Sequence, residues 1–291
     1  EEKTVSEYLK NSKELVDKAV ESGVDVIKWQ VHNLEDEQMK LEVISPHFDG
    51  TDRYSWVKRN TEATPLEDFW KPLKRYCDGK GIGFLVTPMS RGAAQRISVL
   101  GVDAWKIGSA DILDFPMLDF LRNTGKPIIL STGMSSMEEI KKSINFIKAK
   151  NNDLVVLHCV SKYPCPTEEL RLGNIKLLQQ ELSCPVGFSD HSLDIDPDLL
   201  AVALGAVIVE KHFSLDRDFW GPDHKVSTTP EGLKSLVQEI RKLEDSLIEK
   251  EELLNSEMAA QALKEQEKII QEGEDKFRPL FRKSLVAACN M

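Results

Sequence analysis

The segment Gly101-Val-Asp-Ala-Trp-Lys-Ile-Gly-Ser109 begins with a glycine of the kind that ends a helix, continues as a short apolar strand and finishes in polar residues. Two other segments share this design, Gly23-Val-Asp-Val-Ile-Lys28 and Gly205-Ala-Val-Ile-Val-Glu-Lys211. A glycine after a helical pattern is typical of a helix C-cap, and the apolar run that follows it is typical of a strand buried on both faces. The repetition indicates that one βα unit is used several times along the chain.

Seven such strands are predicted, and helical patterns separate them: residues 25–30, 83–88, 104–109, 127–132, 154–161, 185–190 and 207–213. This alternation implies a parallel sheet, which is either an open doubly wound sheet or a closed barrel. An open sheet should carry polar residues only at its switch-point strands, whereas here nearly every strand ends in them. The sequence therefore predicts an α/β TIM (β/α)8-type barrel whose strand ends surround one mouth.

The chain opens on a helical pattern that leads into the strand at 25–30, so the first strand of eight is expected to be missing, as at the cut end of a longer chain. We expect the N-terminally truncated barrel to occupy residues 1–272. It should include a long polar connection at 31–64, which is a candidate lid or interface loop. After Thr229-Pro230 the pattern predicts helix to about Gln271, and residues 273–291 are expected to begin a linker.

Charge and cysteine content disfavour several classes of protein. The chain has 38 Lys and Arg residues and 48 Asp and Glu residues. The basic residues form no stripe that could follow a phosphate backbone, which argues against a nucleic-acid partner. No apolar run approaches the ~18 residues of a membrane span. The five cysteines contain no Cys-x-x-Cys pair, so reduced thiols in the cytoplasm are the simplest interpretation.

Lysines and hydroxyl residues recur at the predicted strand ends. Lys28, Lys106 and Lys211 lie in apolar strands, where an unpaired ammonium group is costly. Each could point outward or pair with a helix carboxylate, but the recurrence favours two or three inward cations. Together with the hydroxyls of Thr87, Ser109, Ser131 and Ser189, they would form a pocket for a small dianion, a phosphate or a carboxylate.

Two histidines end neighbouring predicted strands, His191 and His212. One histidine at such a position is usually structural. Two of them, with Asp190, Glu210 and Asp223 nearby in sequence, predict an open site for Mn²⁺, Fe²⁺, Co²⁺ or Zn²⁺. His158 lies in mid-strand and is predicted to belong to the core. The segment 219–227 is predicted to close over the mouth, although it could also be a solvated Gly-Pro turn.

Eight short strings resemble, in order, the barrel domain of the sialic acid synthase family, which includes N-acetylneuraminate, legionaminic acid and pseudaminic acid synthases. The resemblance covers residues 7–286. The strings are Ile27-Lys-Trp-Gln30, Val86-Thr-Pro88, Lys106-Ile-Gly-Ser109, Leu130-Ser-Thr-Gly-Met134, Leu157-His-Cys-Val-Ser-Lys-Tyr-Pro164, Gly187-Phe-Ser-Asp-His191, Glu210-Lys-His-Phe213 and Gly221-Pro-Asp-His224.

This resemblance implies a condensation of phosphoenolpyruvate with an N-acetylmannosamine-type sugar, giving a nine-carbon 2-keto acid and phosphate. It implies a homodimer and a divalent metal on His191 and His212, Mn²⁺ first, with Mg²⁺ or Co²⁺ as alternatives. It also implies catalytic roles for Lys28, Lys106, Tyr163 and Asp223, the last two on the sugar side. The implied phosphoenolpyruvate ligands are Lys28, Thr87, Lys106, Ser109, Ser131, Ser161, where asparagine is common in the family, and Ser189.

The chain departs from the family pattern at both ends. Family members begin with a strand whose glutamate contacts the sugar, and they end in a small antifreeze-like domain; this sequence is expected to lack both. Two alternatives therefore stay open. One is another phosphoenolpyruvate-condensing synthase or metal aldolase, against which the strings Ser189-Asp-His191 and Glu210-Lys-His-Phe213 argue. The other is a non-catalytic barrel used for binding or assembly.

Overall fold

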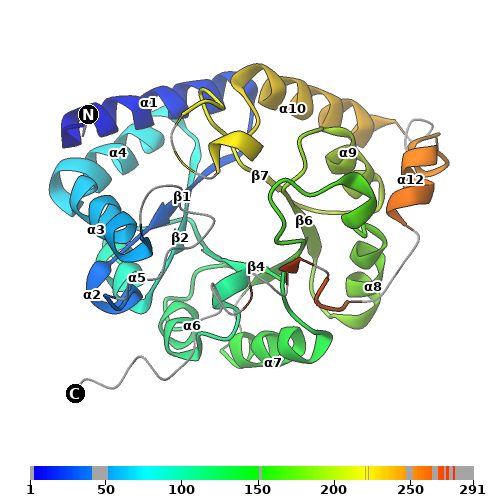
Figure 1. The fold of residues 1–291 in the computed structure, drawn as a ribbon, viewed down its shortest axis with the longest axis horizontal. Helices are drawn as coiled ribbons and strands as arrows, with labels where there is room; N and C mark the ends of the chain where they lie inside the picture. Colours follow the sequence, from blue (N-terminus) through cyan, green and yellow to red (C-terminus); the bar gives the residue numbers. More distant parts are fainter. Residues whose placement is uncertain are drawn as a thin grey trace.

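A seven-stranded sheet, parallel throughout and paired in chain order, forms the centre of the molecule. The computed structural model describes residues 3–40, 52–150, 153–219, 221, 223–246, 252–263, 268–271, 273–274 and 278. Helices surround the strands as a ring, which confirms the predicted α/β barrel (Figure 1). The strands are β1 (Val26–Val31), β2 (Gly83–Pro88), β3 (Ala104–Ile107), β4 (Ile128–Ser131), β5 (Leu154–Cys159), β6 (Val186–Asp190) and β7 (Val209–Lys211).

The helices follow the strands as the βα repeat predicts. Their bounds are α1 (Val5–Ser22), α2 (Leu34–Glu37), α3 (Arg53–Ala63), α4 (Lys71–Lys80), α5 (Arg91–Ser98), α6 (Phe115–Arg122), α7 (Met137–Lys148), α8 (Gly173–Glu181), α9 (Asp196–Ala203), α10 (Pro230–Asp245) and α12 (Glu257–Ala262). The three repeat glycines have left-handed φ angles of 82°, 68° and 92° at Gly23, Gly101 and Gly205. This is the conformation that glycine adopts without strain at a helix end.

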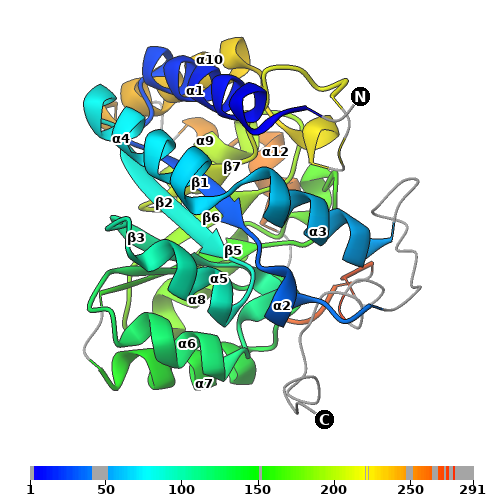
Figure 2. The same ribbon diagram turned by 90° about the vertical axis from the view of Figure 1, so that its left-hand side faces the viewer.

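Helices α1 and α10 lie side by side next to the edge strands β1 and β7 (Figures 1 and 2). The predicted last barrel helix and the added helix after it are α10, which ends at Asp245, and α12, which ends at Ala262. The predicted end point near Gln271 is wrong, because Lys268–Gln271 is not helical. Lys268 and Gln271 are buried instead. In the connection 31–64, α2 and α3 are described, whereas residues 41–51 lie outside the described residues. Within the described ranges, no helix has the length and apolarity that crossing a bilayer requires.

The strands sort their side chains into two layers. Because side chains alternate along a strand, residues two apart face the same side. Leu85, Ala104, Ile129 and Leu157 form a separate apolar cluster from four neighbouring strands, and we call it the barrel floor. Two residues further along the same strands stand Thr87, Lys106, Ser131 and Cys159. The intervening residues Val86, Trp105 and Leu130 pack in the larger core under the helices.

Candidate active site at the carboxyl ends of the strands

Two lysines and a glutamate meet inside the barrel. Glu210 of β7 lies 3.5 Å from Nζ of Lys28 on β1 and 3.3 Å from Nζ of Lys106 on β3. Strands β1 and β3 are not neighbours of β7, so this contact crosses the barrel interior. Lys106 is buried and donates a hydrogen bond of 2.6 Å to Oγ of Ser131. The structure thus brings two of the three predicted lysines together with a predicted hydroxyl, around a carboxylate that was not predicted as their partner.

Burial and charge act in opposite directions on this cluster. Burial lowers the pKa of Lys106, although Glu210 opposes the effect. Burial alone would raise the pKa of Glu210, but Lys106 and Lys28 outweigh it and hold the pKa of Glu210 far below its ordinary value. A hydrogen bond from Ser189 acts in the same direction. The cluster is therefore a preorganised array of two lysines held around one carboxylate.

The remaining predicted hydroxyls line the same end of the barrel. Ser109 Oγ accepts a hydrogen bond of 2.9 Å from the N–H of Gly133. A β-carbon on Gly133 would overlap the hydroxyls of both Ser109 and Ser161, so the two hydroxyls converge on this glycine. Thr87 is 4% exposed, and among the described residues its hydroxyl has no hydrogen-bond partner. A buried hydroxyl without a partner is costly, and a bound anion would supply the acceptor that Thr87 lacks.

His191 and His212 lie next to each other with ring centroids 5.4 Å apart, and Tyr163 lies 4.0 Å from His191. The Nδ1 of His191 lies 2.7 Å from the carbonyl oxygen of Val160 and donates to it, so Nε2 is the ring nitrogen that a metal could use. Burial would lower the pKa of His191, but Cys159 outweighs it and raises this pKa. His212 lies 3.8 Å from Asp223. Burial lowers the pKa of His212 to about 4, only partly opposed by Asp223, so this imidazole also offers a lone pair at neutral pH.

These donors fit a metal ion that takes two ligands from the protein and the others from substrate or water. Among the described residues there is no group of three or more His, Cys, Asp or Glu side chains that could hold a metal. A metal held by His191 and His212 alone would need its other ligands from substrate or water.

Lys211 and Asp190 belong to a different network, so the expectation that they serve the mouth is wrong. Lys211 forms an ion pair with Asp190 and lies 3.0 Å from Asp198 of α9, and the side chains of all three are at most 3% exposed. The physical reason is strand alternation: Glu210 and His212 face the interior, so Lys211 between them faces the helices. The prediction that His158 belongs to the core is confirmed, since it is buried and its Nε2 lies 2.7 Å from the carbonyl oxygen of Leu170.

Glu274 was missed by sequence reasoning. It is fully buried and accepts hydrogen bonds from the N–H groups of Met134 and Ser161 at the ends of β4 and β5. The sequence around it shows no periodic pattern that would place it there. Its segment, red in Figure 1, lies beside β4.

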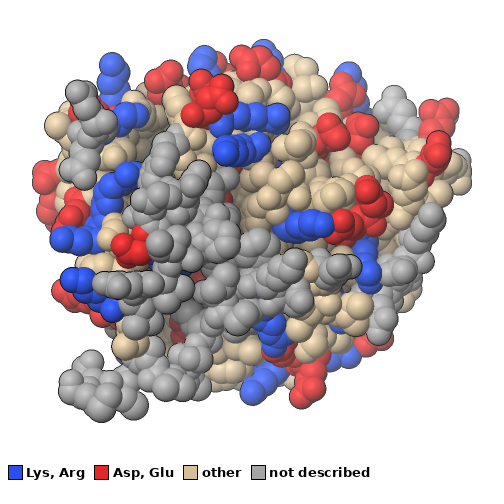
Figure 3. Space-filling model, in the orientation of Figure 1, with Lys and Arg blue, Asp and Glu red and all other residues tan. Residues whose placement is uncertain are grey.

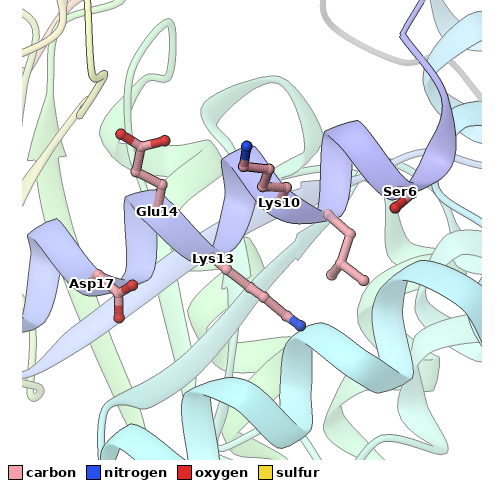
Figure 4. A pocket seen from close by; sticks show the side chains of 6 residues that line it. Ser6, Lys10, Lys13, Glu14 and Asp17 are labelled. Atoms are coloured by element: carbon pink, nitrogen blue, oxygen red, sulfur yellow. The ribbon is translucent and has the colours of Figure 1, made fainter.

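The outer surface offers no comparably organised site among the described residues. On the face shown in Figure 3, basic and acidic side chains are interleaved. A depression of about 400 Å³ on α1 is lined by Ser6, Leu9, Lys10, Lys13, Glu14 and Asp17 (Figure 4). It holds both signs of charge, and Asp17 is already bonded to Tyr76 at 2.9 Å. We assign no ligand to it.

Two curated synthases are similar to this chain over at least half of its length. The chain is 39% identical over 169 residues to the N,N'-diacetyllegionaminic acid synthase of Campylobacter jejuni, covering 57% of this chain and about half (51%) of that protein. It is 33% identical over 254 residues to the human N-acetylneuraminate-9-phosphate synthase, covering 85% and 70% of the two chains.

The crystal structure of the N-acetylneuraminic acid synthetase of Leptospira borgpetersenii, in complex with citrate, superposes with a TM-score of 0.72 at 30% identity, over 86% of this chain and 87% of that one. Residues 15–252 match the sequence pattern of the NeuB family. With this match and these relatives, the chain belongs to the NeuB family.

Proposed function

We propose that this protein condenses phosphoenolpyruvate with an N-acetylmannosamine-type amino sugar, giving a nine-carbon 2-keto sugar acid and phosphate. The observation that carries the proposal is the pairing, in one barrel mouth, of a two-lysine anion pocket with a pair of neighbouring imidazoles. Membership of the NeuB family supports the class of reaction. The printed names of the relatives give different products, so the sugar is proposed only as a class.

Lys28 and Lys106 are proposed to bind the phosphate and carboxylate groups of phosphoenolpyruvate. Glu210 keeps the two ammonium groups in place before the ligand arrives, at 3.5 Å and 3.3 Å. In this largely buried site, charge-assisted hydrogen bonds are stronger than they are in water. The hydroxyl donors are Thr87, Ser109, Ser131, Ser161 and Ser189. They fix the position of the ligand and thus the direction in which its C3 carbon points.

In the proposed reaction, C3 of phosphoenolpyruvate forms a bond to the aldehyde carbon of the open-chain sugar, and the aldehyde oxygen takes up a proton. Water then adds to C2, and phosphate leaves from C2 to give the 2-keto acid. A divalent metal, Mn²⁺ in our proposal, held by His191 and His212, would polarise the aldehyde oxygen. Tyr163 and Asp223 are proposed to bind the sugar. Burial raises the pKa of Tyr163, so its hydroxyl stays protonated and can donate a hydrogen bond.

The test is release of phosphate from phosphoenolpyruvate by the full-length protein with N-acetylmannosamine and Mn²⁺, with and without a chelator. We expect release that needs both substrates and stops with the chelator, and we expect His212→Ala to abolish it while the circular dichroism spectrum is unchanged. No release by the full-length protein would refute the proposal and favour a non-catalytic barrel. Release only with shorter aldoses would indicate a related synthase, and release that is unaffected by chelator and by His212→Ala would exclude the metal site.

A further inference from the structure

Glu274 joins the ends of two neighbouring strands through one carboxylate. Its Oε1 accepts hydrogen bonds from the N–H of Met134 (3.0 Å) and of Ser161 (2.8 Å), and its Oε2 accepts one from the N–H of Gln271 (3.0 Å). Met134 follows β4 and Ser161 follows β5. A carboxylate at 0% exposure is tolerated only when it is well bonded, and these three amide donors supply the bonds.

Met134 is held in a conformation that it would not adopt readily by itself. Its φ angle is 55°, in the left-handed region, which costs a residue other than glycine roughly 1–2 kcal/mol. Residues from the end of the chain bind both of its backbone polar groups. Glu274 accepts from its N–H, and Arg278 Nη1 donates to its carbonyl oxygen at 3.2 Å. These contacts stabilise the strained turn after β4.

The strained turn lies against two of the proposed phosphoenolpyruvate ligands. Gly133, the residue before Met134, donates to Ser109 Oγ, and there is no room for a β-carbon between it and the hydroxyls of Ser109 and Ser161. Glu274 therefore binds the backbone on both sides of the contact between Gly133 and Ser161: the N–H of Met134, which follows Gly133, and the N–H of Ser161. A shift of either backbone would move a hydroxyl that faces the pocket.

We propose that Glu274 is a positioning residue for the anion pocket. It fixes the amide groups of Met134 and Ser161, and through them the hydroxyls of Ser109 and Ser161 that receive phosphoenolpyruvate. The assignment of this ligand rests on the proposed function. Glu274 itself does not touch the substrate in this proposal, because its two oxygens are occupied by backbone N–H groups.

The test compares Glu274→Ala and Glu274→Gln with Glu252→Gln, which removes an exposed glutamate from the same terminal region. Hydrogen exchange followed by mass spectrometry reports on peptides that contain Met134 and Ser161, and steady-state kinetics gives KM and kcat for phosphoenolpyruvate. In Glu274→Ala we expect faster exchange in both peptides and a KM raised about tenfold with kcat nearly unchanged, since two hydrogen bonds to a charged acceptor are lost. Glutamine can place its carbonyl oxygen at the Oε1 position, so it should restore most of the affinity.

A purely structural role predicts a different result. A lower melting temperature and a lower kcat with an unchanged KM would overturn the proposal, as would wild-type exchange at both peptides. If Glu274→Ala does not fold, Glu274→Asp, which withdraws the carboxylate by one methylene, gives the same readouts. A wild-type protein that neither binds nor consumes phosphoenolpyruvate would refute the proposed function and the ligand named here. The exchange experiment would still decide the positioning role, because faster exchange supports it and unchanged exchange refutes it.

Discussion

Removal of the charge of Glu210 should destabilise the empty site. In Glu210→Gln the side chain keeps its size, but the ammonium groups of Lys28 and Lys106 lose their shared counterion. Lys106 has little access to water that could replace it, because its side chain is only 5% exposed. The two lysines also repel each other, since Lys28 contributes to the lowered pKa of Lys106.

The size of the effect follows from burial. Breaking a fully buried ion pair costs about 3–5 kcal/mol. The side chains of Glu210 and Lys28 are 18% and 25% exposed, so water solvates them in part and offsets part of the lost ion-pair energy. We therefore expect the free energy of unfolding of Glu210→Gln to be lower than that of the wild type by about 2–3 kcal/mol at pH 7.

The pH dependence has a defined sign. Burial would raise the pKa of Glu210, but the two lysines lower it below the ordinary value of 4.5. A carboxylate whose folded pKa is depressed contributes its full stability above the unfolded pKa and loses it as the pH falls through the folded pKa. The stability difference between wild type and Glu210→Gln should therefore be constant from pH 7 to about pH 5 and shrink below about pH 4.5.

Urea denaturation at a series of pH values measures this difference. Glu181→Gln is the matched control, because Glu181 pairs with Lys141 at 2.7 Å on the outer surface, where its side chain is 46% exposed. Exposed pairs of this kind contribute little, so the control should unfold like the wild type. A Glu210→Gln protein as stable as the wild type at pH 7, or a difference that does not change at low pH, would show that Glu210 does not neutralise the lysines.

Two other substitutions separate binding from folding. Thr87→Val removes a buried hydroxyl that lacks a partner among the described residues. It should leave the free energy of unfolding unchanged or raise it by about 1 kcal/mol, whereas calorimetry should show weaker binding of phosphoenolpyruvate; a clear loss of stability would contradict this. Lys211→Met leaves Asp190 and Asp198 buried without their cation. Urea denaturation should show a loss of about 3–5 kcal/mol, and a loss below about 1 kcal/mol would mean that the network is not stabilising.

Many residues at the mouth of the barrel could be predicted from the sequence, because the alternation along each strand determines which side chains face the interior. Lys28 and Lys106 lie within β1 and β3, Ser131 ends β4 and His212 follows β7. The structure brings all four to one end of the barrel. The same periodicity places Glu210 and Lys211 on opposite faces of the sheet. The three-lysine repeat suggested instead that Lys211 faces inward like Lys28 and Lys106. Both residues are charged, so residue type alone does not show which of them faces inward. The alternation of side chains along β7 does show it.

The end of the chain could not be predicted in the same way. The run after Thr229 has a helical composition, but Lys268 and Gln271 are buried and are not helical, and Glu274 is buried as well. Glu274 is bonded to residues that lie more than 100 positions earlier in the sequence. No local pattern encodes such a contact, because the donors are backbone amides, which every non-proline residue carries.

The alternation above the barrel floor also constrains how the chain can fold. Slipping a strand by one residue exchanges its two faces. A slip of β3 would turn Lys106 toward the helices and Trp105 into the barrel, and a slip of β7 would bring Lys211 inward and leave Asp190 and Asp198 without their cation. Each error buries a charge without its partner, at a cost of several kcal/mol. The polar residues proposed to bind substrate therefore also disfavour wrong strand registers, before any ligand is present.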